Sequence, residues 1–533
     1  MNHKEELNNL KKIESEILLG GGIESHKKQK AKGKFSARER IEKLIDKNSK
    51  FLEIGLFSAY KMYEEFGGAP SAGVVVGIGK IEKRDCVIVS NDATVKAGAW
   101  FPMTCKKILR AQEISIENNI PIIYLVDSAG VFLPLQSEIF PDKEHFGRIF
   151  FNNSIMSSKG ITQIAAIMGP CVAGGAYLPV LSDESIIVDG TGSVFLAGSH
   201  LVKAAIGEEI ENEKLGGATV HSEISGVTDY KAKDDFEAIK IIRSIVNKIG
   251  EPTLAGFNKI KSVKPKFQID EILNILPTEN QKQYSMKKII DCIVDENSFD
   301  EYKSGYGKTL ICGYARVNGW SVGIVANERM ISKTKTGELQ IGGVIYSDSA
   351  DKATRFILNC NQKKIPLIFF QDVTGFMVGS RAEHGGIIKD GAKMVNAVSN
   401  SIVPKFTFIV GNSFGAGNYA MCGKAFSPRL IFAWHTAKIA VMGAKQASET
   451  LQSIRIQSMK KSGKEIDNIE QNKIYEEIFN RYENESSPLF AASKLWVDGI
   501  INPIETREII SRGIEIANCN NKFEKFSTGV IQT

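Results

Sequence analysis

The feature that most restricts the fold of this chain is an internal repeat. Four segments of the first half recur, in the same order, in the second half. The pairs are GIGKIEKRDCVIVSND (77–92) with GYARVNGWSVGIVANE (313–328), IPIIYLVDSAG (120–130) with IPLIFFQDVTG (365–375), ITQIAAIMGPCVAGGAY (161–177) with VPKFTFIVGNSFGAGNY (403–419), and SIIVDGTGSVFLAG (185–198) with LIFAWHTAKIAVMG (430–443). The spacing between partners is nearly the same in all four pairs. A period this long indicates two copies of one domain rather than a solenoid.

The repeat also predicts how the chain is divided. A chain of 533 residues is too long for one hydrophobic core, so at least two domains are expected. We expect a helical leader at 1–50, a first copy at 51–260, a connector at 261–300 and a second copy at 301–533. The connector is polar and contains two prolines, as linkers commonly do.

Each copy alternates short apolar runs with helical stretches. CVIVSND, PIIYLVD, IAAIMG and SIIVD have the pattern of strands, and residues 104–117 and 388–399 have the pattern of helices. Nearly continuous apolar strands separated by helices are typical of a largely parallel sheet that is covered on both faces. The predicted fold class is therefore α/β, and ligands are expected at the carboxyl ends of the strands.

Glycine-rich turns follow one strand of each copy, GPCVAGGAY in the first and GNSFGAGNY in the second. Glycine lets backbone N–H groups face outward without interference from a Cβ atom. Free amides at such a turn suit an anion or a developing oxyanion. The alternative is that these glycines only permit close packing of strand and helix. Because the turns occur at repeated positions, we favour the oxyanion interpretation.

Composition and charge exclude several classes of protein. The chain is 43% hydrophobic and 24% charged, as expected of a globular protein, and its net charge of +6 is small for its length. The basic run at 26–40 is predicted to be a solvated leader rather than a nucleic-acid arm, with a positive patch that faces the phosphate groups of a ligand as the alternative. We therefore expect no nucleic-acid partner.

Cysteine spacing and hydropathy bear on metals and on location. None of the eight cysteines forms a CxxC pair, so neither a zinc ribbon nor a redox dithiol is supported. The N-terminal segment lacks the apolar core of a secretory signal. The longest charge-free stretch, 160–182, has the pattern of a strand, a turn and a helix rather than of a membrane span. We expect a cytoplasmic protein without a membrane anchor or a metal.

With these motifs in hand, the chain resembles a known family from about residue 33 to residue 507. It is similar to the carboxyltransferase β subunits of biotin-dependent acyl-CoA carboxylases, in particular to the methylcrotonoyl-CoA and geranoyl-CoA carboxylase branch. The strings that carry the resemblance are SNDATVKAGAWFP, RAQEIS, YLVDSAG, FPDKEHFGRIFFNNSIMSS, GGAYLPVLSDE, FLAGSHLVKAAIGEE, LGGATVHSEISGVTDY, TGFMVG, GIIKDGAKMVNAV, FGAGNYAMCGKAFSPR and WVDGIINP.

The resemblance implies a fold and a division of labour between the copies. The fold would be a tandem duplication of the crotonase (ClpP-like) ββα superhelix. The first copy would bind acyl-CoA and stabilise the thioester enolate, and the second would bind carboxybiotin and stabilise its ureido oxygen. The ureido anion would take the substrate proton, so no side-chain base is required. The implied catalytic backbone amides belong to Ala173, Gly174, Gly175, Gly415, Ala416 and Gly417.

Side chains are expected to contribute less. Lys96 and Lys203 could reach CoA phosphates, although exposed helix lysines are common without such a role. Gly130, Gly375 and Phe376, which follow the matched strands, complete the predicted binding set. Other conspicuous polar residues are predicted to be structural: Asp127 and Asp372 as caps of the next turn, and His221, His384 and His435 as packing residues.

Biotin itself must come from a partner. The sequence contains neither the Ala-Met-Lys-Met attachment site nor a recognisable ATP-grasp domain, which implies a biotin carboxylase/biotin carboxyl carrier subunit. The resemblance also implies a homo-oligomer, a ring-shaped hexamer in which the two copies at one active site come from different subunits.

The acyl group of the substrate stays open at this point. Ser199 and His200 stand where methylcrotonoyl-specific members commonly have prolines, and the sequence of 328–356 differs from that of the same branch.

Three rival functions are considered beside carboxyl transfer to an acyl-CoA. They are the carboxyltransferase subunit of an acyl-CoA decarboxylase, a simple enoyl-CoA hydratase, and a non-catalytic scaffold that binds CoA and biotinylated partners. The hydratase is disfavoured because neither glycine turn carries the required pair of Glu side chains.

Overall fold

The computed structural model describes residues 2–278, 282–462 and 467–532 and divides into two compact units. The first in chain order comprises residues 10–254 and 492–495, and the second comprises residues 1–9, 255–491 and 496–533. The stretch predicted as a leader, 1–50, does not form a unit of its own. Its first nine residues group with the second unit and the remainder with the first.

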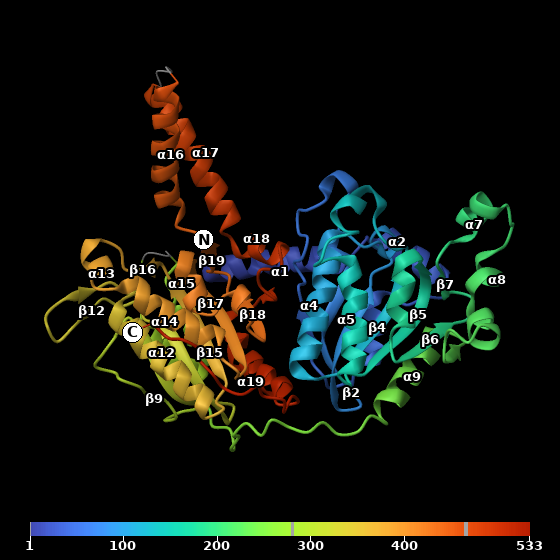
Figure 1. The fold of residues 1–533 in the computed structure, drawn as a ribbon, viewed down its shortest axis with the longest axis horizontal. Helices are drawn as coiled ribbons and strands as arrows, with labels where there is room; N and C mark the ends of the chain where they lie inside the picture. The colour runs from blue at the N-terminus through green and yellow to red at the C-terminus, as the bar shows by residue number, and fades with distance from the viewer. Residues whose placement is uncertain (1, 279–281, 463–466, 533) are drawn as a thin grey trace. The chain divides into compact units, whose positions relative to one another are not determined.

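The first unit is built on one sheet (Figure 1). The strand order is β1-β2-β3-β4-β5-β6-β8, with β7 paired to the far end of β5. β2 is antiparallel to both of its neighbours, β1 and β3, and every pairing from β3 onward is parallel. The strands are β1 Leu52–Ile54, β2 Val74–Ile81, β3 Arg84–Asn91, β4 Ile122–Ser128, β5 Gln163–Val172, β6 Glu184–Val188, β7 Ser193–Phe195 and β8 Tyr230–Ala232.

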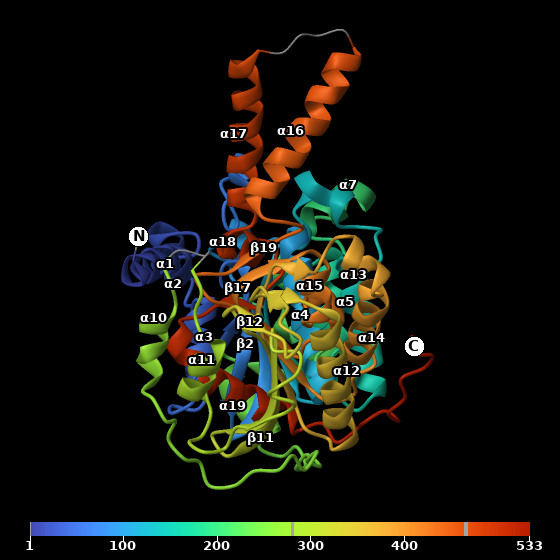
Figure 2. The same ribbon diagram turned by 90° about the vertical axis from the view of Figure 1, so that its left-hand side faces the viewer.

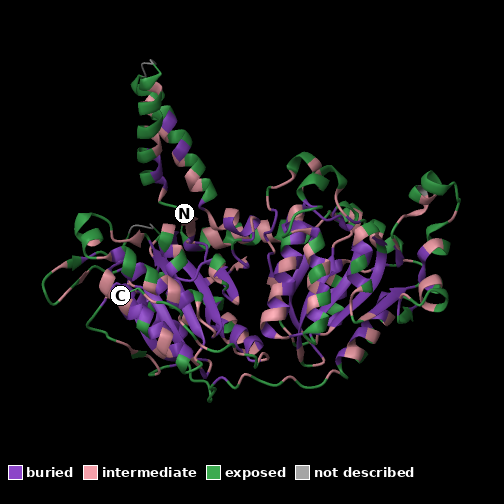
Figure 3. Cartoon of the chain, in the orientation of Figure 1, coloured by how far each residue is buried: buried purple, intermediate pink, exposed green. Residues whose placement is uncertain are grey.

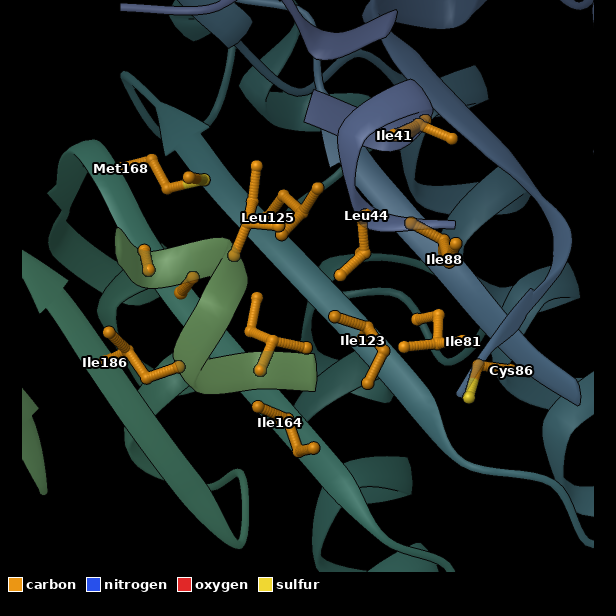
Figure 4. Close-up of a cluster of buried hydrophobic side chains, with 14 of the residues drawn as sticks. Ile41, Leu44, Ile81, Cys86, Ile88, Ile123, Leu125, Ile164, Met168 and Ile186 are labelled. Atoms are coloured by element: carbon orange, nitrogen blue, oxygen red, sulfur yellow. The ribbon is translucent and has the colours of Figure 1, made fainter. Parts of the chain in front are cut away.

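Alternate side chains of these strands enter two different packed layers. Ile123 and Leu125 of β4 point into a cluster formed with α3 (Ala37–Leu44) and α9 (Asp235–Val246), as Figure 4 shows for the labelled residues. Tyr124 points to the opposite face, where its hydroxyl accepts a hydrogen bond from Gln112 of α4 (Pro102–Asn118). Both faces of the sheet are therefore covered, which explains why its central strands are largely apolar and almost entirely buried (Figure 3).

The second unit contains a sheet of the same design. Its order is β9-β10-β11-β15-β17-β18-β20, with β19 paired to the far end of β17. Helix α12 (Ser347–Gln362) and helix α14 (Ile387–Ser399) cover one face. The strands are β9 Asp300–Glu301, β10 Leu310–Val317, β11 Trp320–Asn327, β15 Leu367–Val373, β17 Lys405–Phe414, β18 Leu430–Ala433, β19 Lys438–Ala440 and β20 Gly499–Ile500.

The two sheets correspond strand for strand. β2 and β10 have the same length, as do β3 and β11, β4 and β15, and β5 and β17. In each pair, the first residues of the two strands are as far apart in the sequence as the matched segments that contain or adjoin them. The first residues of helices α4 and α12 are as far apart as those of β4 and β15. Residues of the two copies can therefore be called equivalent by position. The predicted α/β class with parallel sheets is confirmed.

The remaining elements lie outside these matched strands. Helices α16 and α17 form an antiparallel pair that projects from the second unit (Figures 1 and 2). Two short pairs, β12 with β13 and β14 with β16, lie near the carboxyl ends of its strands. The helices are α1 His3–Leu18, α2 Ile23–Ala31, α5 Phe146–Ser158, α6 Tyr177–Val180, α7 Ser199–Ile206, α8 Asn212–Gly216, α10 Ile272–Ile275, α11 Met286–Ile293, α13 Ser380–His384, α15 Gly415–Ala420, α16 Ala444–Lys461, α17 Asn468–Glu485, α18 Pro488–Ser493 and α19 Thr506–Ala517; the short strands are β12 Ser332–Lys333, β13 Leu339–Gln340, β14 Val344–Ile345 and β16 Gly375–Phe376.

Among the described residues, none of the helices combines the length and the apolar character needed to cross a bilayer.

A buried histidine pair ties the N-terminus into the second unit. His3 Nδ1 lies 2.9 Å from His435 Nε2, and His3 Nε2 lies 2.9 Å from the Leu276 carbonyl. A carbonyl only accepts, so His3 donates to Leu276 and, with both rings neutral, receives its second hydrogen bond from His435. Glu6 completes a group of ligand atoms that lie within 4.8 Å of one another. We interpret the group as a hydrogen-bonded pair, and the absence of a metal stays a prediction.

This pair predicts an acid-sensitive stability. Burial lowers the pKa of His435 from 6.5 to about 4. The unfolded chain therefore takes up this proton at a higher pH than the folded chain. The contribution of the neutral His435 to the free energy of unfolding is fully present above about pH 6.5. It is lost as the pH falls towards about 4, at about 1.4 kcal/mol per pH unit. Between pH 7.5 and pH 5, the melting temperature of His435→Asn is expected to fall less steeply than that of the wild type. The exposed His384→Asn is the control, and equal slopes for the wild type and His435→Asn would contradict the assignment.

Candidate active site

The two glycine-rich turns have the same unusual backbone conformation. Ala173 has φ 56°, and Gly415, which is equivalent in position, has φ 52°. Each begins the short helix that follows the longest strand of its sheet. The first amides of a helix have no acceptor within it, so the N–H groups of Gly174 and Ala416 are presented to the surroundings. A left-handed alanine is strained, and strain of this kind is frequent at functional sites.

The end of the neighbouring strand closes against each turn. A Cβ atom on Gly130 would lie 3.2 Å from the Val172 carbonyl, just before the first turn. In the second copy, a Cβ atom on Gly417 would lie 2.6 Å from Val373 Cγ2 and 3.4 Å from Gly375 Cα. Glycine therefore favours this close approach, and Gly130 and Gly375 lie beside the turns. Their predicted role in ligand binding stays a prediction. Phe376 pairs with Ile345 through β14 and β16 and packs on Gly391.

A buried ion network fixes the strand ends of the first copy. Asp127 is the second-last residue of β4, and its carboxylate contacts Lys34 Nζ at 2.6 Å and Arg40 Nη1 at 3.0 Å. Arg40 also donates to Asp235 at 2.8 Å and to the Met168 carbonyl at 3.2 Å. One guanidinium therefore joins β4, β5 and α9. Burial lowers the pKa of Lys34 and nearby Asp127 opposes this shift.

The second copy holds its equivalent carboxylate differently. Asp372 accepts from the Tyr284 hydroxyl at 2.7 Å and from the Asn412 amide at 2.9 Å, and Arg329 Nε lies 3.3 Å away. Burial raises the pKa of Asp372, and burial together with this carboxylate raises the pKa of Tyr284. The sequence interpretation of Asp127 and Asp372 as turn caps is wrong, because both carboxylates bridge separate elements. The prediction that the basic run at 26–40 is solvated is likewise wrong for Lys34 and Arg40, because both side chains are buried.

The second copy has a cavity of about 720 Å³ beside its strand ends. Small-molecule sites commonly have volumes of about 300–1,000 Å³ and mainly apolar walls with a few polar groups. Here the apolar wall includes Tyr346, Met377 and Ile387, and the charged groups include Lys308 and Arg381. Met377 directly follows β16, so the cavity adjoins the TGFMVG string of the sequence.

The first copy has a cavity of about 500 Å³, lined by residues 59–62, 64 and 67–70 together with Glu16, Ile17 and Gly20. Lys96 is exposed at its border, where a Cβ atom on Gly67 would lie 3.1 Å from Lys96 Nζ. Lys203 is placed elsewhere. It lies on the exposed helix α7, pairs with Glu209, and is not among the residues that line this cavity. The structure thus brings one of the two predicted CoA lysines to a cavity.

One component of the site was missed by sequence reasoning. The segment between the second long strand and the next helix covers residues 92–101 in the first copy and residues 328–346 in the second, so the second copy is longer here. The hairpin β12–β13 lies in this longer segment, and Thr334, Thr336 and Glu338 of its turn line the larger cavity. The sequence did contain a signal for this longer segment. The matched segments 120–130 and 365–375 lie further apart in the sequence than the matched segments 77–92 and 313–328 do.

Comparison with known proteins identifies the family. The model of the carboxyl transferase domain matches residues 28–528. The chain belongs to the carboxyl transferase domain family. It is 47% identical over 522 residues to the mitochondrial methylcrotonoyl-CoA carboxylase beta chain of Dictyostelium discoideum, covering 98% of this chain and 86% of that one. It is 46% identical over 501 residues to the biotin-dependent 3-methylcrotonyl-coenzyme A carboxylase beta1 subunit of Mycobacterium tuberculosis, covering 94% and 91%.

A solved structure supports the same assignment. The beta subunit of geranyl-CoA carboxylase from P. aeruginosa superposes with a TM-score of 0.86 at 31% identity, covering 100% of this chain and 96% of that one. The predicted resemblance to the methylcrotonoyl-CoA and geranoyl-CoA carboxylase branch is confirmed, and so is the prediction that this carboxyl transferase family member is an enzyme.

The ion network of the first copy makes a testable prediction about stability. Arg40→Met leaves two buried carboxylates without the guanidinium that joins them, and breaking a buried pair in this way costs about 3–5 kcal/mol. Arg38→Met, on the same helix, removes a partly exposed pair with Glu53 and should cost about 1 kcal/mol. Urea unfolding measures both variants. A midpoint for Arg40→Met as high as that for Arg38→Met would show that the network does not stabilise the fold.

Proposed function

We propose that this carboxyltransferase moves a carboxyl group from carboxybiotin, carried by a partner subunit, to an acyl-CoA of the methylcrotonoyl-CoA type. The observation that supports this proposal most directly is the pair of turns with similar left-handed φ angles at Ala173 and Gly415, in a chain that is 47% identical to a methylcrotonoyl-CoA carboxylase beta chain. Two equivalent sites suit a reaction in which two different carbonyl oxygens become anionic.

In the first copy, the amides of Ala173, Gly174 and Gly175 would hold the thioester oxygen of the acyl-CoA. Deprotonation next to a thioester places negative charge on that oxygen, and each preorganised donor can be worth about 2.7–4 kcal/mol of barrier. Lys96, at the border of the 500 Å³ cavity, would face the CoA phosphates. Lys203 has less support, because its ammonium is paired with Glu209.

In the second copy, the amides of Gly415, Ala416 and Gly417 would hold the ureido oxygen of biotin. Carboxybiotin, when bound, supplies the carboxyl group. The adjoining 720 Å³ cavity has the size and the mixed lining that a small bicyclic ligand requires. Gly375 and Phe376 would form the floor between this cavity and the turn, because β16 follows β15 directly. The equivalence of the two sheets supports an origin by tandem duplication of one crotonase-like domain.

Apolar residues around both turns support a homo-oligomer, which we propose to be a hexamer. Leu133 is 76% exposed and its equivalent Val378 is 74% exposed. Two further equivalent pairs, Tyr177 with Tyr419 and Leu196 with Val441, are also exposed. Exposed apolar residues point to an interaction surface where they gather in one region. We propose that the first copy of one chain faces the second copy of another, and that biotin arrives on a biotin carboxylase/biotin carboxyl carrier subunit. A cytoplasmic location stays a prediction.

The reverse half-reaction tests this function without a partner or ATP. Purified chain is incubated with free biotin and with malonyl-CoA, methylmalonyl-CoA or 3-methylglutaconyl-CoA, and acyl-CoA is followed by chromatography. We expect biotin-dependent loss of 3-methylglutaconyl-CoA, because the accepted carboxyl group must return to biotin at the same site. Loss of another substrate instead would correct the acyl group. If all three stay intact in the presence of a purified biotin carrier as well, the methylcrotonoyl-CoA type of substrate is excluded, and CoA binding then separates an untested acyl chain from a protein that is not a carboxyltransferase.

The second turn predicts a specific catalytic defect. Gly417→Ala forces a Cβ atom to within 2.6 Å of Val373, whose branched side chain has little freedom, so the turn must shift. A displaced donor should lower kcat by about tenfold to a hundredfold in the reverse assay. Gly250→Ala, where no atom lies within 4 Å of the new methyl group, is the control. Wild-type kcat for Gly417→Ala would remove the turn from the mechanism.

A further inference from the structure

Among the residues that the structure describes, each copy contains one lysine that is 0% exposed and for which the proposed reaction has no role. Lys107 is the sixth residue of α4, and Lys352 is the sixth residue of the equivalent helix α12. Both are 0% exposed. A lysine is almost never this deeply buried unless its ammonium group is paired with another group. The repeated position indicates a requirement that both copies share.

The ammonium of Lys107 is enclosed by three oxygen atoms. Nζ donates to the Ser71 carbonyl at 3.0 Å, to the Ser71 hydroxyl at 2.7 Å and to the Val74 carbonyl at 2.7 Å. An ammonium has three donors, so this set satisfies it. Burial lowers the pKa of Lys107 to about 7. All three acceptors belong to one short loop, residues 71–74, which the lysine therefore gathers around itself.

This loop is strained. Ser71 has φ 52° and Ala72 has φ 56°, and Gly73 continues in the same left-handed region. Non-glycine residues pay on the order of 1 kcal/mol or more for this conformation, so they need contacts that hold them in it. Lys107 contacts the first strained residue through both its carbonyl and its hydroxyl. The ammonium thus stabilises the loop where it departs most from ordinary geometry.

The second copy repeats the arrangement. Lys352 Nζ lies 3.5 Å from the carbonyl of Gly307, which has φ 56°. Gly307 stands three positions before the start of β10, as Ser71 stands three positions before the start of β2. The two residues are therefore equivalent by position, by conformation and by the lysine that contacts them. Because glycine adopts this conformation without strain, this loop needs less support from its lysine than the loop at 71–74 does. Gly307 also packs directly on α12, where a Cβ atom would lie 2.8 Å from the Asp348 carbonyl.

Both loops lie at the ligand edge of their sheets. Val74 pairs with Asn91, the last residue of β3, and Leu310 pairs with Asn327, the last residue of β11. The loops therefore stand at the carboxyl ends of the parallel strands, on the same edge as the glycine turns. In the first copy, Ala69 and Pro70, which directly precede the loop at 71–74, line the 500 Å³ cavity, so the loop supports the cavity wall from behind. In the second copy, residues 305–308, which include Gly307, line the 720 Å³ cavity directly.

From this geometry we infer that Lys107 and Lys352 are positioning residues, each of which holds the loop that walls the ligand cavity of its own copy. The inference rests on the proposed function, in which the first cavity receives acyl-CoA and the second receives biotin. Lys107 then sets the affinity for acyl-CoA and Lys352 the affinity for biotin, although neither touches its ligand.

The kinetic test uses Lys107→Met and Lys352→Met in the reverse half-reaction, with KM measured separately for acyl-CoA and for free biotin. Lys107→Met should raise the KM for acyl-CoA at least about tenfold and leave that for biotin within about twofold, because a displaced cavity wall impairs one ligand only. Lys352→Met should show the opposite pattern. Lys106→Met, an exposed neighbour on α4, is the control. Equal changes in both KM values, or none, would overturn the assignment.

A second measurement separates this inference from the proposed function. Hydrogen exchange followed by mass spectrometry should show faster exchange at residues 69–74 in Lys107→Met and at 305–310 in Lys352→Met, each without the other. This result does not depend on turnover, so an inactive wild type would refute the function and still leave the positioning role measurable. Unchanged exchange in both loops would refute the positioning role. If Lys107→Met does not fold, Ser71→Ala, which removes one of the three acceptors, should raise exchange in the first loop only.

Discussion

A carboxylate inside a protein must be matched by donors, and each unit of this enzyme places one at the end of its central parallel strand. A Cβ atom on Gly169 would lie 1.9 Å from Asp127 Oδ1, and one on Gly411 would lie 2.5 Å from the Asp372 carboxyl group. The carboxylate therefore dictates how closely the next strand passes. That strand carries the glycine turn, so the position of the turn amides depends on the buried carboxylate as well as on the glycines of the turn itself.

The sources of the matching charge differ between the copies. In the first, Lys34 and Arg40 reach back from the segment that precedes the sheet. In the second, Arg329 comes from the loop after β11 and Tyr284 from the segment before α11. The same requirement has been met twice with unrelated partners. This explains why the matched sequence segments include the two aspartates but not the cations that neutralise them.

Much of the fold could be predicted from the sequence, because apolar runs and their repetition report on the interior. The helix predicted at 104–117 extends over Pro102–Asn118, since proline is favoured in the first turn of a helix. The helix predicted at 388–399 is Ile387–Ser399. The glycine turns were also correctly placed after β5 and β17. These features depend on local pattern, which a single sequence displays fully.

Long-range charge pairing could not be predicted in the same way. Lys34 and Arg40 belong to a basic run that is indistinguishable by composition from a solvated one, and Lys107 follows another lysine on a helix. Only the folded chain shows that Lys107 is enclosed while Lys106 is exposed. Lys203 illustrates the reverse case, in which a lysine that looked suited to a phosphate is paired on an exposed helix.

The hairpin β12–β13 shows where this architecture tolerates change. The second copy is longer than the first at this point, yet α12 and β15 resume the correspondence at once and the strand order is unaltered. Insertions at the carboxyl edge alter the shape of a cavity without disturbing the register of the sheet beneath it. A change of loop length at this edge can therefore reshape the cavity of one copy while the buried framework of the sheet stays the same in both.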